Sequence, residues 1–137
     1  HKSIMGAFER FMAFLLEKTS GNLPVWLAPE QVRIISVNQE QPTLDYIKML
    51  EQLAKENSVR YGVDNSNQSV GKKIREAELM KIPYTIVIGE KEIENGKATP
   101  RIRQDLVVND SHLELTMDGF FKTVRNESLM RVNKTSL

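Results

Sequence analysis

Two stretches of the chain place apolar side chains at helical spacing. Residues 1–20 and residues 43–57 each repeat apolar positions in steps of three and four, which predicts two amphipathic helices. Gly21 is a natural terminator of the first helix, and Thr43 is a natural N-cap of the second. The first helix is rich in phenylalanine and needs a covering surface. If the chain is a piece of a longer protein, that helix exposes apolar area. The apolar stripe of the second helix comprises Leu44, Ile47, Leu50 and Ala54.

A third helix is expected between two strands, residues 59–64 and residues 84–88. Ser69 is its expected N-cap, and Pro83 ends it before the second of these strands. That strand is short, β-rich and mostly apolar, which is typical of a strand buried on both faces. The stripe of the helix that faces the core comprises Val70, Ile74 and Ala77.

Beyond the third helix, the pair Asn95-Gly96 is typical of a tight hairpin turn, which predicts a returning strand over residues 97–103. Pro100 suits an edge strand or a bulge. Arg101 and Arg103 are two positions apart, so in a strand both side chains project from the same face.

Helices and strands alternate through the middle of the chain. A first strand is expected at residues 31–37, and a short strand at 112–115 with a helix at 119–130 closes the chain. Alternation of this kind favours parallel strands with helical crossovers, and the hairpin adds an antiparallel part. The pattern therefore predicts an α/β fold with a mixed sheet flanked by helices.

Composition narrows the class of protein. A chain of 137 residues is one ordinary domain, and it has no apolar run of about 18 residues that would predict a membrane span. The N-terminus lacks the order of a signal peptide. With no cysteine, the chain cannot form a disulfide or a cysteine zinc site, which fits a reducing, cytoplasmic setting.

The net charge of +1 is unevenly distributed. Residues 72–103 hold eight Lys or Arg against five Glu, whereas the rest of the chain carries a small negative excess. This modest basic excess suits phosphate contacts by a few side chains better than the coating of a nucleic acid.

Catalytic motifs are absent from the sequence. It contains no Walker loop, no dinucleotide-binding glycine motif and no nucleophile elbow, and its two histidines, His1 and His112, belong to no metal-binding cluster. The pairs Glu76/Glu78 and Glu90/Glu92 have Lys and Arg neighbours, so solvated ion pairs are favoured over an acid/base dyad. A self-contained catalytic site is not expected.

Recognition is the chemistry that the remaining polar residues support. An Arg fork suits a guanine edge or a phosphate, an Asn amide suits an unpaired base, Glu accepts from base imino or amino groups, and Lys contacts phosphate. Unpaired RNA bases are read by such convergent groups. A plain solvated surface is the alternative. The set comprises Asn67, Arg75, Lys91, Glu92 and Arg101.

Several segments carry a resemblance to a known family. The run Gly71-Lys-Lys-Ile-Arg-Glu-Ala-Glu-Leu-Met-Lys-Ile-Pro-Tyr and the run Val87-Ile-Gly-Glu-Lys-Glu are similar to the anticodon-binding domain of class II aminoacyl-tRNA synthetases. Within that class the chain resembles the threonyl-tRNA synthetase family. Residues 6–11 resemble the end of class II motif 3, and residues 24–32 resemble the entry to the anticodon domain. The likeness covers residues 1–103 and weakens afterwards.

The resemblance implies a mixed, mostly parallel five-stranded sheet with helices on both sides, preceded by one linker helix. It divides the chain into the tail of a catalytic domain at 1–21, a connector at 22–30 and the anticodon-binding domain at 31–137.

The resemblance also implies a binding site for the anticodon of threonine tRNA. The second and third bases of that anticodon are guanine and uracil. Lys81 stands where bacterial relatives often carry Arg, so a bidentate contact is lost there while a phosphate contact survives. The residues that the resemblance assigns to this site are Asn67, Arg75, Lys81, Lys91, Glu92 and Arg101.

For the parent protein the resemblance implies a threonine–tRNA ligase that uses ATP, Mg and Zn and forms a homodimer through its catalytic domain. Arg10 matches an arginine that contacts ATP in the family, and His1 stands where the family places one zinc ligand. The other ligands would lie in a domain that this sequence lacks, so we expect the isolated chain to be catalytically inactive, with threonine tRNA as its partner and with neither DNA nor a membrane.

Two alternatives stay open. A stand-alone RNA-binding or accessory protein could reuse a synthetase domain. A small-molecule-binding α/β domain would instead have a closed apolar pocket and no affinity for tRNA.

Overall fold

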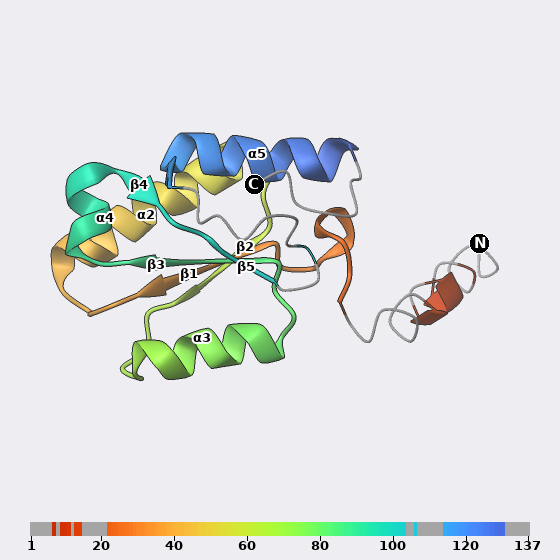
Figure 1. Ribbon diagram of the computed structural model, residues 1–137, viewed down its shortest axis with the longest axis horizontal. Coiled ribbons are helices and arrows are strands. Elements are labelled where there is room, and N and C mark those ends of the chain that lie inside the picture. The colour runs from red at the N-terminus through yellow and green to blue at the C-terminus, as the bar shows by residue number, and fades with distance from the viewer. Residues whose placement is uncertain are drawn as a thin grey trace.

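A computed structural model of the chain describes residues 7, 9–11, 13–14, 22–103, 106 and 114–130. The described residues form a sheet with helices on both faces (Figure 1). After the short 3-10 helix η1 (Val25–Leu27), the elements are β1 (Val32–Ser36), α2 (Gln41–Glu56), β2 (Tyr61–Asp64), α3 (Val70–Leu79), β3 (Tyr84–Ile88), α4 (Glu90–Asn95), β4 (Lys97–Ala98), β5 (Arg101–Ile102), β6 (Leu115–Thr116) and α5 (Met117–Met130).

The main sheet has the strand order β2-β1-β3-β5. The strand β1 pairs in parallel with both β2 and β3, whereas β5 pairs antiparallel with β3 at one edge. The strands β4 and β6 form a separate antiparallel pair. The expected mixed, mostly parallel α/β fold is confirmed. The strand count differs, because the described residues form a four-stranded sheet and a two-stranded one instead of a single sheet of five strands.

The helices α2 and α5 cover one face of the sheet (Figure 1). Alternate residues of β1 and β3 point into this layer, where Tyr84 and Phe120 meet edge to face with ring centroids 5.8 Å apart. Phe120 also meets Phe121 at 5.2 Å. The Tyr84 hydroxyl donates a 2.5 Å hydrogen bond to the buried carboxylate of Glu127, which ties β3 to α5.

Of the helices in the described part of the chain, α3 is the one that covers the other face (Figure 1). Ser69 caps it as expected, because its hydroxyl accepts a hydrogen bond from the Lys72 N–H. Ala77 is buried as predicted. Lys73 is buried as well, which the sequence analysis did not anticipate.

The helices α2 and α3 end in the same way. In each, the residue after the C-cap has positive φ, Ser58 at 54° and Lys81 at 61°. The next residue, Val59 or Ile82, donates back to the buried helix residue Ala54 or Ala77. This is the Schellman arrangement, in which Gly is the usual residue at positive φ.

Several expected boundaries are corrected. The pair Asn95-Gly96 is no hairpin turn; it ends α4, a helix not expected from the sequence, with Gly96 in the left-handed region. The expected strand at 97–103 is divided around Pro100 into β4 and β5, which belong to different sheets. The helix α2 begins two residues before Thr43, because Pro42 occupies the first turn and Thr43 is buried inside the helix.

The described residues of the expected first helix, Ala7, Glu9–Phe11, Ala13 and Phe14, are helical and exposed. The Phe11 and Phe14 side chains are 51% and 59% exposed, so the apolar area predicted for this helix is present. His1, His112 and most of the segment from 104 to 113 lie outside the described residues. No helix in the described part of the chain is long and apolar enough to cross a membrane.

Candidate nucleic-acid interface

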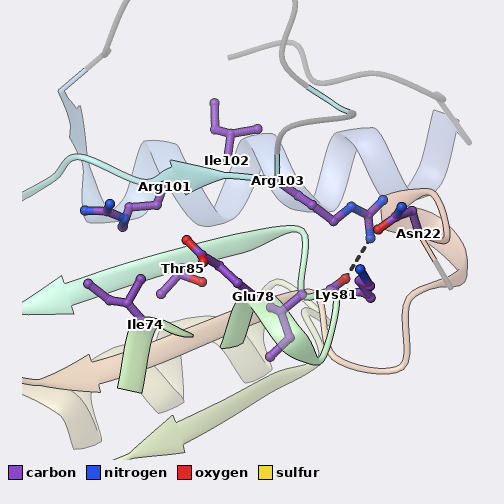
Figure 2. A pocket seen from close by; sticks show the side chains of 9 residues that line it. Asn22, Ile74, Glu78, Lys81, Thr85, Arg101, Ile102 and Arg103 are labelled. Atoms are coloured by element: carbon purple, nitrogen blue, oxygen red, sulfur yellow. Dashed lines mark hydrogen bonds between the residues drawn. The ribbon is translucent and has the colours of Figure 1, made fainter. Parts of the chain in front are cut away.

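A pocket of about 610 Å³ opens beside α3, over the edge strand β5 and its neighbour β3. In Figure 2, the side chains of Ile74 and Glu78 from α3 lie on one side of the pocket, and Arg101 and Arg103 from the β5 segment lie on the other. The side chains that matter for its chemistry are those of Ile74, Glu78, Lys81, Thr85, Arg101 and Arg103.

The two arginines of the β5 segment have different roles. Arg101 is paired in register with Thr85, and its guanidinium makes no hydrogen bond or salt bridge with any residue that the structure describes. Arg103 donates from Nη1 to the Lys81 carbonyl at 2.7 Å and from Nη2 to the Leu23 carbonyl. Arg103 thus fixes the segment before β3, whereas Arg101 is available to a ligand. Both side chains lie on the pocket side of the chain, as strand alternation predicts (Figure 2).

Arg75 is exposed on the flank of α3 that borders this pocket. At about 100° per residue around the helix axis, the Arg75 side chain projects about 60° from that of Glu78, which lines the pocket, and about 40° from position 71. A Cβ at Gly71 would meet nothing within 4 Å, so the space in front of this flank is open. Within the described part of the chain, the Arg75 guanidinium has no salt bridge, and the possible pairing with Glu78 or Glu92 is not formed.

The loop between β2 and α3 carries Asn67, which is exposed at the carboxyl end of the parallel strands. Asp64 starts this loop and accepts a 3.1 Å hydrogen bond from the Ser66 N–H. Burial alone would raise the pKa of Asp64. Hydrogen bonding from Ser66 and the positive charges of Lys73 and Arg33 outweigh that effect and hold its pKa below the ordinary value.

Lys73 is the residue that sequence reasoning missed at this end of the sheet. Its Nζ donates to the Ser36 carbonyl at 3.0 Å and to the Ser36 hydroxyl at 3.3 Å, and that hydroxyl in turn donates to the Asp64 carbonyl at 3.4 Å. A buried ammonium thereby joins the ends of β1 and β2. The signal was present, because position 73 lies on the same helical stripe as Val70 and Ala77.

Lys91 and Glu92 lie in the first turn of α4, at the carboxyl end of β3. Lys91 is exposed, and no described residue pairs with its ammonium. Glu92 accepts a 2.9 Å hydrogen bond from the Gly89 N–H and so stabilises the start of α4. The pKa of Tyr46 on α2 is raised, first by burial and then by the charge of Glu92.

The structure thus brings Lys81 and Arg101 together in the pocket, with Arg75 on its bordering flank. Asn67, Lys91 and Glu92 lie at the carboxyl ends of the strands instead. The residues expected to serve a catalytic domain stand apart from this group: Arg10 is an exposed helical residue, and His1 lies outside the described residues. In the described ranges no three His, Asp or Glu side chains are grouped to hold a metal.

Comparison with known proteins identifies the class. The family model described as "Anticodon binding domain" matches residues 31–127. The chain therefore belongs to the anticodon-binding domain family. Among individual relatives, it is 38% identical over 133 residues to the threonine–tRNA ligase of Clostridium botulinum (strain Loch Maree / Type A3) and 39% identical over 132 residues to that of Nitrosomonas eutropha. The expected resemblance to threonyl-tRNA synthetases is confirmed.

These matches cover 97% and 96% of this chain but only 20% of each ligase, so the chain spans about a fifth of the length of the curated relatives. Among solved structures, the RNA-binding domain of threonyl-tRNA synthetase from Cryptosporidium parvum superposes with a TM-score of 0.75 at 33% identity, covering 86% of this chain and 28% of that one. Prolyl-tRNA synthetase from the same organism shares the fold, with a TM-score of 0.66 at 21% identity over 80% of this chain and 23% of that one.

Proposed function

We propose that this chain is the anticodon-binding domain of a threonine–tRNA ligase and that it reads the second and third anticodon bases, guanine and uracil, of threonine tRNA. The observation that carries the proposal is the group of cations on the α3 side of the sheet. Lys81 and Arg101 line one pocket, and Arg75 is on the helix that borders it. All three residues are exposed, and no described residue neutralises their side-chain charges.

Unpaired cations favour an anionic ligand for a physical reason. A guanidinium that already pairs with a carboxylate must lose that bond before it contacts RNA, whereas Arg75 and Arg101 have no such bond with any residue that the structure describes. Their donor forks suit bidentate contact with guanine or phosphate. The charged lining of the neighbouring pocket also disfavours the closed apolar pocket that a small-molecule domain would need.

In the parent enzyme, this domain would select the tRNA that the catalytic domain charges at the expense of ATP. ATP, Mg and Zn would be held largely by the remainder of such an enzyme, with Arg10 contacting ATP and His1 contributing one zinc ligand. Homodimerisation would use that remainder as well. The chain alone should therefore show no threonine-dependent ATP–pyrophosphate exchange.

The test is binding of an RNA stem-loop that carries guanine and uracil at the second and third anticodon positions, followed by fluorescence anisotropy. Arg75→Ala should weaken binding by about 5- to 150-fold, because a bidentate contact with guanine is worth roughly 1–3 kcal/mol. The loss should shrink on a stem-loop that lacks this guanine.

Arg125→Ala is the matched control, because Arg125 is an exposed arginine on α5, across the sheet from α3 (Figure 1). It should change the affinity less than twofold. Absence of RNA binding by the wild-type chain, or equal losses on the two stem-loops, would contradict base recognition by Arg75.

A further inference from the structure

The pocket beside α3 has a composition that phosphate binding does not explain. Ile74 and Glu78 are one helical turn apart, so both side chains point from α3 into the pocket (Figure 2). Thr85 lies on the sheet below them and is paired in register with Arg101. The volume of about 610 Å³ lies within the range of pockets that hold small ligands and is sufficient for one nucleotide.

Glu78 is the unexpected member of this lining. Lys81, Arg101 and Arg103 give the pocket three cations, which suit an RNA backbone, but a carboxylate repels phosphate. The Glu78 carboxylate makes no hydrogen bond or salt bridge with any described residue, so it does not serve to hold one of these cations in place.

A carboxylate favours RNA binding only where it accepts hydrogen bonds from a base. Guanine presents two donors side by side on its Watson–Crick edge, N1–H and N2–H, which match the two oxygens of a carboxylate. Ile74 supplies an apolar surface for the face of the base, and Arg101, whose guanidinium no described residue pairs with, remains available for the backbone.

We propose that Glu78 is a specificity-determining residue that accepts hydrogen bonds from the N1–H and N2–H of an unpaired guanine seated in this pocket. This inference rests on the proposed function, since it assigns a further edge of the guanine to a protein side chain. Arg75 lies three residues earlier on the same flank of α3. Its guanidinium would donate to O6 and N7 on the other edge of the same guanine.

The experiment is a cycle of two protein forms and two RNAs. Wild type and Glu78→Gln are each titrated with the guanine-bearing stem-loop and with the same stem-loop carrying inosine, which lacks the N2 amino group. Glu78→Gln should weaken binding of the guanine RNA by about fivefold or more, because one acceptor of the bidentate pair becomes a donor. On the inosine RNA the loss should be clearly smaller.

Glu76→Gln is the matched control. Glu76 is on the same helix, but at about 100° per residue it points about 160° away from Glu78. Removing a negative charge there should leave RNA affinity unchanged or raise it slightly. Since both glutamates belong to the helix surface, thermal unfolding of the two variants should match that of the wild type.

The outcomes separate this inference from the proposed function. If both Gln variants bind the guanine RNA as well as the wild type or better, Glu78 is only a solvated carboxylate and the inference fails while the proposed function stands. If Glu78→Gln loses equally on guanine and inosine, its role is not base recognition. If the wild-type chain binds neither RNA, the proposed function itself is wrong.

Discussion

The two faces of the sheet are filled by different kinds of residue. Under α2 and α5, large apolar side chains from both layers pack together, and the ring of Phe120 is fully buried between Tyr84 and Phe121. Under α3, the residues that the helix buries most completely are Ala77 and Lys73, and an open pocket lies over β3 and β5.

This difference separates stability from recognition. Burial of apolar area is the main favourable term in folding, so the α2/α5 face contributes most of the stability. The α3 face buries less apolar area, and at its surface Arg75 and Arg101 have no partner among the described residues. Substitutions on the two faces should therefore change different measured quantities.

The largest effect is expected from Phe120→Ala. Removing this ring leaves a cavity between β3 and α5, which should lower the free energy of unfolding by about 3–5 kcal/mol in urea titrations. At temperatures where the variant remains folded, its RNA affinity should match that of the wild type, because α5 lies across the sheet from the interface (Figure 1).

Leu129→Ala on the same helix is the control. This side chain is 68% exposed, and its removal should lower the free energy of unfolding by less than about 0.5 kcal/mol. A large loss of RNA affinity by folded Phe120→Ala would show that the two faces are not separable.

Lys73→Ala should have the next largest effect, because this residue is buried on the α3 face of the sheet. The substitution leaves the Ser36 carbonyl without its ammonium donor, which should destabilise the fold by about 1–3 kcal/mol. RNA affinity should also fall, since Lys73 joins the strand ends from which the Asn67 loop starts.

Lys48→Ala is the control for charge alone, because Lys48 is an exposed lysine on α2. Its unfolding free energy should change by less than about 0.5 kcal/mol. A Lys73→Ala chain as stable as Lys48→Ala would mean that the buried ammonium contributes nothing net.

The α2/α5 face could be predicted from sequence because apolar periodicity reports burial directly. The stripe through Ile47, Leu50 and Ala54 and the strand at 84–88 are where the pattern placed them. Periodicity failed where polar residues decide the structure. The Glu92 side chain caps a helix in a segment where the pattern predicted none, and Asn95-Gly96 ends that helix although the same pair is typical of hairpins.

The candidate site was predictable in its residue types but not in its grouping. Arg75 and Arg101 are exposed as the recognition hypothesis requires. Their relation to Glu78 depends on the pairing of β5 with the outer edge of β3, a long-range contact that local patterns do not encode. Lys73 was overlooked because a lysine is almost never fully buried unless its charge finds partners, and its partner Ser36 is 37 positions away in sequence.

The smallest effect is expected from Lys81→Gly, which tests whether the residue at the end of α3 lowers the free energy of unfolding. A non-glycine residue at positive φ is strained, so glycine should raise the free energy of unfolding by roughly 0.5–1 kcal/mol. Ser58→Gly is a matched control, because Ser58 ends α2 in the same conformation, and it should stabilise the fold by a similar amount.

The two variants should differ in RNA binding. Lys81→Gly removes an ammonium from the pocket, which should weaken binding of all stem-loops evenly and reduce the slope of log affinity against log salt by about 0.7. Ser58→Gly should leave both affinity and slope unchanged. If the two glycine variants bind RNA equally well, Lys81 makes no phosphate contact, and its strained conformation then has no explanation in recognition.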